Sequence, residues 1–203
     1  MVGTNGNRPS EPQSPWAVFN QILYDVCATY PDHINEPEVA AKVVLIGRTY
    51  SVALERAKRP GESADDFYLK RVVPTIIESG IDEWISGLAK FEAPNRETMM
   101  PQILRVHRQV VDLIQGITDR QHRSFASKYL HFHRPEHFFI FDSRAEAKGR
   151  ELAFNVPRRS DLSLFSEPTY HLFVERCLFL VEQQFEKTGV RPTPRELDTW
   201  LLE

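Results

Sequence analysis

The residues most able to do chemistry are concentrated between Arg123 and Arg144, in the stretch RSFASKYLHFHRPEHFFIFDSR. Its pattern predicts an amphipathic helix that ends at Pro135, an apolar run from Phe138 to Phe141, and then Asp142 at the start of another helix. Asp is a favoured residue just before a helix, so a purely structural cap explains this position. An acid delivered by an apolar run, however, lies at the edge of a core, where a carboxylate can stabilise a developing oxocarbenium ion. Spacing alone leaves both interpretations of Asp142 open.

Four aromatic or imidazole side chains share this stretch: Tyr129, His131, His133 and His137. His131 and His133 are two residues apart and point to different faces of a helix, while Pro135 separates His133 from His137. This spacing does not favour a metal site, and we expect none. Tyr129, His131 and His133 are instead candidates for stacking on a nucleic-acid base and hydrogen bonding to it, with ordinary packing as the alternative.

The elements that would position these residues are all predicted to be helices, because apolar residues recur at three- and four-residue spacing along the chain. In the first helix, Trp16, Phe19 and Ile22 are predicted to face the core. Pro74 is expected to kink a later helix, and Gly116 to end another. Helices are predicted over residues 15–29, 37–58, 63–78, 81–91, 97–115, from 123 to the break at 135, 143–154, 168–187, and after a capping box at 193–196. The expected fold is all-α, with about eight helices in two lobes.

The length of 203 residues and the ordinary composition indicate one globular domain. Residues 1–14 are interpreted as a flexible leader without the apolar core of a signal peptide, and residues 15–203 as a single domain. No apolar run approaches the roughly 20 residues that cross a bilayer, so we expect a cytoplasmic protein with no membrane partner. Cys27 and Cys177 lie far apart in apolar helical patterns, which predicts buried free thiols. They are too few for an iron–sulfur cluster, and we expect no metal or organic cofactor.

The net charge of −3 is unevenly distributed along the chain. From Arg105 to Arg159, eleven Lys or Arg and six Asp or Glu give +5, which leaves −8 for the remaining residues. A basic middle on an acidic remainder fits a face that contacts phosphates, with scattered solvated charge as the alternative.

The segment ASKYLHFHRPEHFFIFDSR, about a tenth of the chain, resembles the part of helix-hairpin-helix DNA glycosylases that ends in their catalytic aspartate. In that superfamily a helix leads through a loop of the type Pro…Phe-Pro-hydrophobic-Asp into a second helix, which the aspartate opens. The resemblance implies Asp142 as the catalytic carboxylate and double-stranded DNA with an altered base as the substrate. The superfamily's glycine-rich hairpin turn is replaced by residues 116–124, with one glycine. The chain is therefore more similar to the 8-oxoguanine-glycosylase-like proteins of bacteria and phage-defence systems than to the repair enzymes.

Without that glycine-rich turn, phosphate binding is expected to fall to nearby polar side chains: Arg120, Arg123, Ser124 and Arg144. Bifunctional members of the superfamily attack the sugar with a lysine farther from the aspartate, whereas Lys128 precedes Asp142 by only 14 residues. A Schiff-base role requires a desolvated lysine with a depressed pKa, and a phosphate-contacting or solvated lysine is the alternative. We therefore expect a monofunctional enzyme, with Lys128 kept as a second catalytic candidate.

Arg48 and Tyr50, in GRTYSVALER, are polar residues within a predicted apolar helix. The similar bacterial proteins carry a Gly-Arg-Thr/Ser-Tyr run at this point, which implies that both residues line a base pocket opposite Asp142. A buried Arg48 that pairs with Glu55 or Asp82 is the structural alternative.

These patterns and the resemblance together imply a monomeric DNA glycosylase that hydrolyses the N-glycosidic bond of a flipped base and leaves an abasic site. Defence against phage DNA that carries a modified cytosine, for example a glucosylated one, is one expected role, and repair of a damaged purine is the alternative. A helical nucleic-acid-binding module without activity, in which Asp142 is only a cap, is a further alternative, as is a histidine-metal nuclease.

Overall fold

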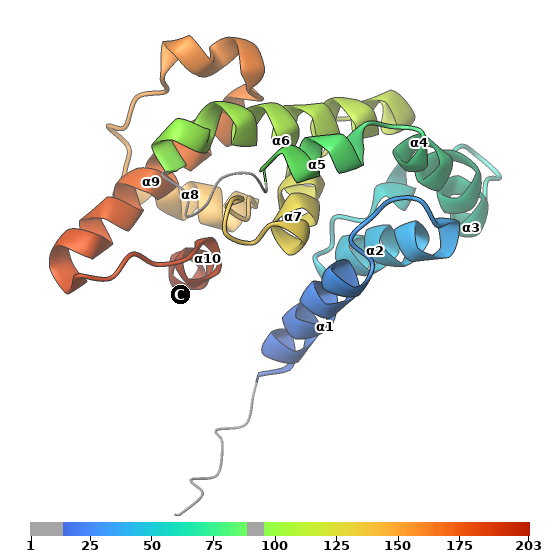
Figure 1. Ribbon diagram of the computed structural model, residues 1–203, viewed down its shortest axis with the longest axis horizontal. Helices are drawn as coiled ribbons and strands as arrows, with labels where there is room; N and C mark the ends of the chain where they lie inside the picture. The colour runs from blue at the N-terminus through green and yellow to red at the C-terminus, as the bar shows by residue number, and fades with distance from the viewer. Residues whose placement is uncertain (1–13, 89–95) are drawn as a thin grey trace, which may run out of the picture.

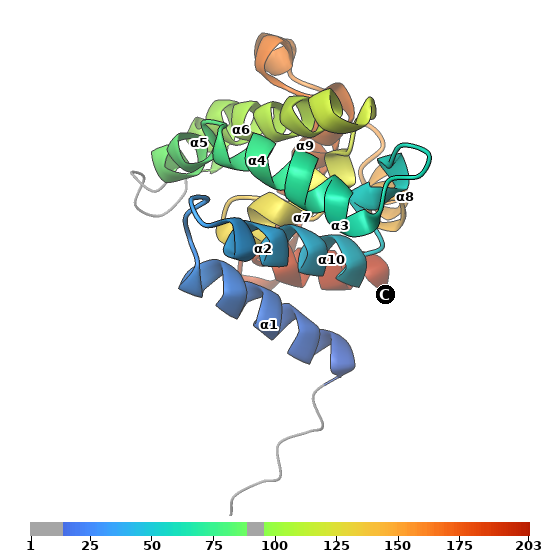
Figure 2. The ribbon, with the colours of Figure 1, turned by 90° about the vertical axis from the view of Figure 1, so that its right-hand side faces the viewer.

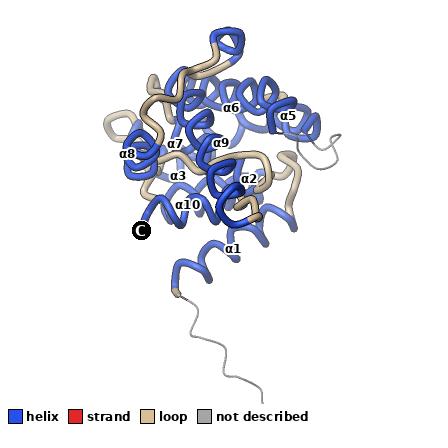
Figure 3. Tube along the Cα trace, turned by 90° about the vertical axis from the view of Figure 1, so that its left-hand side faces the viewer, coloured by secondary structure: helices blue, strands red, loops and turns tan. Residues whose placement is uncertain are grey.

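The computed structural model describes residues 14–88 and 96–203, which form helices joined by loops and turns, with no strand among them (Figures 1 and 3). The all-α prediction is confirmed, with ten α-helices in these residues against about eight expected. The predicted leader up to residue 13 and the end of the helix predicted over 81–91 lie outside the described residues.

The helices begin largely where prolines and caps predict. Pro15, Pro168 and Pro194 each open a helix, and Thr193 forms both hydrogen bonds of a capping box with Glu196. The α-helices are α1 (Pro15–Thr29), α2 (Glu36–Thr49), α3 (Ala64–Phe67), α4 (Val73–Ile77), α5 (Ile81–Leu88), α6 (Arg96–Thr118), α7 (Arg123–His133), α8 (Ser143–Leu152), α9 (Pro168–Thr188) and α10 (Pro194–Leu202). Three further helical turns are η1 (Leu54–Ala57), η2 (Tyr68–Val72) and η3 (Ser160–Phe165).

The helix predicted over 37–58 is wrong in its second half, because α2 ends at Thr49. The chain turns sharply there, and Ser51 adopts a positive φ of 56°. The returning chain packs against Gly47, where an added Cβ would lie 3.3 Å from the Cα of Ala53. This glycine therefore permits the turn that ends the helix, which the apolar periodicity of the segment does not reveal.

Of three other predicted features, the break at Pro74 is confirmed and two helix ends differ. Pro74 does interrupt the helix predicted over 63–78, which is divided into α3, a π-type turn at η2, and α4. Gly116 does not end α6, which continues to Thr118. A glycine lowers helix stability by only about 1 kcal/mol relative to Ala, so tertiary packing can carry the helix through it. Helix α8 ends at Leu152, two residues earlier than predicted.

Buried apolar side chains form two clusters. Helices α1 to α5 and α7 build the first cluster with much of α6, and α8 to α10 build the second with η3 and the start of α6. Helix α7 lies in the interior, between α2 and α6 in Figure 2, and contacts both of them as well as α1. Each side chain from Phe125 to His133 is buried, so α7 is the helix around which the first cluster is organised.

The apolar run after α7 joins the two clusters. Phe138 packs into the first cluster, whereas Phe139 and Phe141 pack into the second. The hydroxyl of Tyr170 in α9 donates a hydrogen bond to the carbonyl of Phe139 at 3.0 Å. The chain therefore crosses from one cluster to the other over this short run, and Asp142 follows at their junction.

Three large apolar residues of α1 do not face the core as predicted. Trp16, Phe19 and Ile22 are 60, 47 and 46 % exposed, whereas Leu23 and Cys27 are buried. Helix α1 packs on α2 and α7 with one side only. Its apolar stripe is wider than the surface that these helices cover, so part of the stripe faces solvent.

Replacing Thr193 with Ala is expected to lower the free energy of unfolding by about 1 kcal/mol, because the capping box of α10 is lost. Thr193 Oγ1 accepts from the backbone amide of Glu196 at 3.2 Å, and Glu196 accepts from that of Thr193 at 2.7 Å. Urea denaturation measures the change. Thr199→Ala, at an exposed position within α10, is the matched control and should cost less than about 0.5 kcal/mol. Equal losses in the two variants would contradict the capping role.

Candidate active site

Asp142 caps α8 and is held in one orientation. Its Oδ1 accepts hydrogen bonds from the backbone amides of Arg144 and Ala145, both at 2.9 Å. The partial positive charge at the start of the helix also favours a carboxylate here. The side chain nevertheless stays 30 % exposed. The residue is therefore a cap and an accessible carboxylate at once.

The backbone just before Asp142 is clamped to α7. The carbonyl of Phe141 accepts from Ser124 Oγ at 2.9 Å and from Lys128 Nζ at 2.7 Å. The amide of Phe141 donates to Ser127 Oγ at 3.0 Å. These contacts fix the peptide that precedes the cap, so the position of the carboxylate depends on α7 as well as on α8. Ser124, a predicted phosphate ligand, instead donates its hydrogen bond to this carbonyl.

Lys128 provides a buried positive charge next to Asp142. The side chain is 1 % exposed, and its Nζ lies 4.0 Å from Asp142 Oδ2. Burial lowers the pKa of Lys128 to about 8, although Asp142 and Asp198 both act in the opposite direction. Its Nζ also donates to Ser124 Oγ at 2.9 Å and lies 5.5 Å from the centre of the Tyr50 ring.

The exposed side of Asp142 faces a cleft with a volume of about 340 Å³. Binding sites for small organic groups typically have volumes of about 300–1,000 Å³. Helices of both apolar clusters contribute to its wall, which includes Trp16, Tyr50, Ser51, Asp142, Arg195 and Asp198. The C-terminal helix α10 contacts α8 and lies beneath it in Figure 1, so the last helix of the chain closes one side of the cleft. Ser51, with its positive φ, forms part of the opposite wall.

Sequence reasoning missed Asp198, the second carboxyl group of the cleft. Asp198 is 4 % exposed, and Arg195 Nη1 donates to its Oδ2 at 2.9 Å. Burial raises the pKa of Asp198 to about 6, against the attraction of the Arg195 guanidinium. A signal was available in the sequence. Positions 194, 197, 198 and 201 follow the i, i+3, i+4, i+7 pattern of a buried helix face, and Asp198 is the charged residue on that face.

Tyr50 was predicted as a pocket residue and lies in the wall of the cleft. Its hydroxyl donates to Asn20 Oδ1 of α1 at 2.5 Å and accepts from Arg195 Nη1 at 3.3 Å. Burial raises the pKa of Tyr50, so the phenol remains neutral at physiological pH. Tyr50 thus links α1, the end of α2 and α10 across the cleft.

Tyr129 and His133 lie in a buried polar network, outside the cleft. His33 Nδ1 donates to Asp82 Oδ1 at 2.5 Å, and its Nε2 accepts from the Tyr129 hydroxyl at 2.8 Å. His133 Nδ1 donates to the carbonyl of Tyr129 at 2.8 Å, and its ring stacks on that of His33. These contacts hold α5, α7 and the loop before α2 together. Tyr129 and His133 therefore have the packing role that was the alternative to base contact.

His131 likewise joins elements of the fold. Its Nδ1 donates to the carbonyl of Phe138 at 2.8 Å, and its Nε2 lies 2.6 Å from the hydroxyl of Tyr24 in α1. His131 is fully buried, and burial lowers its pKa to about 4. The neutral ring therefore accepts from Tyr24 and fixes both α1 and the apolar run to α7.

The predicted arginines are placed at different sites. Arg144 lines the cleft and donates to the carbonyl of Leu202 at 3.2 Å. Arg48 lies outside the residues that line the cleft and pairs at the surface with Glu55 at 3.3 Å. Arg123 pairs with the buried Glu167 at 3.1 Å, which holds α7 to the start of α9. Arg120 is exposed in the turn between α6 and α7. The structure thus brings Arg144, Asp142 and Tyr50 together in one cleft.

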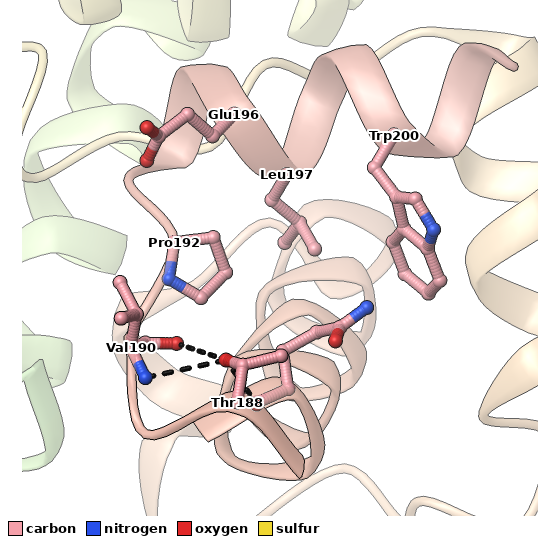
Figure 4. Close-up of a pocket in the computed structure, with 7 residues that line it drawn as sticks. Thr188, Val190, Pro192, Glu196, Leu197 and Trp200 are labelled. Carbon is pink, nitrogen blue, oxygen red and sulfur yellow. Dashed lines mark hydrogen bonds between the residues drawn. The ribbon is translucent and has the colours of Figure 1, made fainter.

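Two other hollows offer less chemistry. One, of about 450 Å³, includes Tyr24, Cys27 and His133, but burial raises the pKa of Cys27 to about 12, which suits an inert thiol. The other, between the end of α9 and α10 (Figure 4), is lined mainly by apolar side chains such as Leu197 and Trp200. Its carboxylate, Glu196, is used in the capping box.

Within residues 14–88 and 96–203, no group of three or more His, Cys, Asp or Glu side chains is arranged to hold a metal ion. Cys27 and Cys177 are buried and are not joined in a disulfide, as predicted. None of the helices described is both long and apolar enough to cross a membrane. No protein-family model, curated protein or solved structure matches the chain.

Proposed function

We propose that the chain is a DNA glycosylase that hydrolyses the N-glycosidic bond between deoxyribose and a base flipped into the Asp142 cleft. One observation carries this proposal. The Asp142 carboxylate is fixed by two backbone amides through Oδ1 and backed by a buried lysine ammonium 4.0 Å from Oδ2, yet it remains accessible in a cleft. The enzyme would act as a monomer on double-stranded DNA and leave an abasic site.

The carboxylate is suited to this reaction because the bond breaks with positive charge developing on the sugar. A preorganised negative group next to the sugar stabilises that charge without reorienting as the reaction proceeds. The same carboxylate can orient the attacking water. The hydrogen bonds from two backbone amides hold the carboxylate rigid, and the open side of the cleft makes it accessible.

The walls of the cleft suit a flipped nucleotide. Trp16 and Tyr50 offer aromatic surfaces, and aromatic side chains stack on bases that have left the duplex. Arg144 and Arg195 place positive charge at the same cleft, where phosphates adjoining the flipped sugar would lie. The target base is either a modified cytosine of phage DNA or a damaged purine.

The proposal is tested by incubating the purified protein with genomic DNAs of different base modification and with oligonucleotides that carry single damaged bases. Mass spectrometry of the small-molecule fraction identifies any released base, and an aldehyde-reactive probe counts abasic sites. We expect one DNA class to yield free base and abasic sites in equal number. Binding of DNA without release from any substrate would instead support the non-catalytic module, and strand cleavage abolished by chelator would support a metal nuclease.

We further propose that the enzyme is monofunctional, because Lys128 Nζ is bonded to Phe141 and Ser124 and is not accessible to the sugar. Borohydride is expected to trap no covalent complex of the wild-type protein with DNA. Lys128→Met should slow base release without abolishing it, because the two backbone amides still hold the Asp142 carboxylate in place. The Phe141 carbonyl keeps the Ser124 and Ser127 hydroxyls as donors in this variant. A trapped complex that disappears in Lys128→Met would show that the lysine is the nucleophile.

A further inference from the structure

Asp198 places a second carboxyl group in the wall of the cleft that contains Asp142. Its two oxygens differ sharply. Oδ2 accepts from Arg195, whereas Oδ1 is buried and has no hydrogen-bond partner among the described residues. A buried oxygen without a partner is costly unless it carries a proton or meets a ligand. Within the described residues, this asymmetry leaves one oxygen of a cleft-lining carboxyl group without a partner.

The charged and titratable groups around Asp198 come from five elements: Arg195 on α10, Asp142 at the start of α8, Lys128 on α7, Tyr50 at the end of α2 and Tyr24 on α1. Burial and the negative charge of Asp142 raise the pKa of Asp198, and Arg195 and Lys128 lower it, with a net value of about 6. The neutral acid is therefore populated under mildly acid to neutral conditions. Where two carboxyl groups share one site, one can act as the acid and the other as the charge stabiliser.

We propose that Asp198 is the proton donor to the leaving base, and that the cleft accordingly serves bases that are uncharged in DNA. This inference rests on the glycosylase function proposed above. The geometry that supports it is the unpartnered buried Oδ1 in the wall of the cleft, on the helix that faces the Asp142 cap.

The bond between C1′ and the base nitrogen breaks, and its electron pair goes to the base. The proton of Asp198 is transferred to a ring nitrogen or carbonyl oxygen of the base, which leaves as a neutral molecule. The sugar becomes an oxocarbenium ion beside the Asp142 carboxylate. Water adds at C1′ and loses its proton to that carboxylate, and both groups then exchange protons with solvent.

The substrate class follows from this assignment. A purine alkylated at N3 or N7 already carries a positive charge and leaves as a neutral base without a proton donor. A modified cytosine or an oxidised purine is uncharged and would leave as an anion unless it is protonated, so it gains most from an acid in the site. Modified cytosines and oxidised purines therefore gain from Asp198. Among damaged purines, only the alkylated, cationic ones do not need it.

The test compares single-turnover base release by the wild type and by Asp198→Asn between pH 5.5 and 8.5, on the DNA that the release experiment identifies. Asn keeps an oxygen for Arg195 but has no acidic proton. We expect the variant to be about 100-fold slower at pH 5.5. The wild-type rate should then fall tenfold per pH unit above about 6, so that the two rates converge near pH 8. Because Lys128 titrates in both proteins, the ratio of the two rates isolates Asp198.

Each outcome decides the proposal. A ratio that stays constant with pH, or equal rates throughout, would overturn the proton-donor role while leaving the glycosylase function intact. Release of only N3- or N7-alkylated purines would also overturn the proton-donor role. No release by the wild type overturns both proposals. If Asp198→Asn does not fold, Arg195→Gln provides the test. Loss of the guanidinium should raise the pKa of Asp198 and so move the descending limb of the pH profile to higher pH by about one unit. An unchanged limb in that variant contradicts the role.

Discussion

Replacing Asp142 with Asn is expected to reduce the rate of base release by about 10³-fold or more while leaving the fold intact. Removing a preorganised charged group from a transition state typically costs this much. Asn accepts hydrogen bonds from the first amides of a helix about as well as Asp does, so the cap of α8 is retained. The substitution therefore separates the two roles of the residue. Activity is followed by single-turnover base release, and stability by urea denaturation.

Ser63→Ala is a suitable control for this comparison. Ser63 caps α3, where its hydroxyl accepts from the amide of Asp66 at 3.0 Å, and it is not among the residues that line the cleft. The variant should lose about 1 kcal/mol of stability and none of the activity. If Asp142→Asn released base at the wild-type rate, or if its activity fell only in proportion to its stability, Asp142 would be a cap alone.

Lowering the pH from 7.5 to 4.5 is expected to reduce the free energy of unfolding, chiefly through buried histidines. His107 and His131 are both fully buried, and burial lowers the pKa of each to about 4 from an ordinary value of 6.5. Between these values the unfolded chain binds more protons than the folded one, so stability rises with pH. Each histidine contributes about 3 kcal/mol, which is present above pH 6.5 and lost towards pH 4.

Asp198 acts in the opposite direction. Its pKa is about 6 in the folded protein and 3.8 without its surroundings, so the folded state binds more protons between these values and gains stability as pH falls. Urea denaturation at pH 7.5 and 4.5 separates the two effects. His107→Gln should shrink the pH-dependent loss by about 3 kcal/mol, and Asp198→Asn should enlarge it by a similar amount. Identical pH dependence in all three proteins would contradict the assignment of buried neutral histidines.

Much of the fold was predictable because local chemistry determines it. Pro15 and Pro168 open helices, Thr193 caps α10, and Pro135 separates α7 from the apolar run. The end of α2 was not predictable from periodicity, because the turn at Ser51 depends on how the chain packs against Gly47. Local preferences of this kind are outweighed wherever a tertiary contact is worth more than about 1 kcal/mol.

The candidate site was predictable only in part. Asp142 follows an apolar run and precedes a helix, and both features are visible in the sequence. Its partner Asp198 is far away in the chain, and only the pattern of α10 hints that it is buried. Trp16 was assigned to the core because periodicity identifies an apolar stripe without showing which side is covered. The histidines of α7 were candidates for base contacts, but their partners His33 and Tyr24 lie in other elements.

The most direct test of the role of Asp142 measures released base and abasic sites side by side for the wild type and Asp142→Asn, on the same panel of modified and damaged DNAs. We expect the wild type to release one free base for each new abasic site from at least one DNA. We expect the Asn variant to bind the same DNA with similar affinity and to release no base above background. Equal release by the two proteins, or no release by the wild type from any DNA, would contradict the proposal that Asp142 is the catalytic carboxylate of a DNA glycosylase.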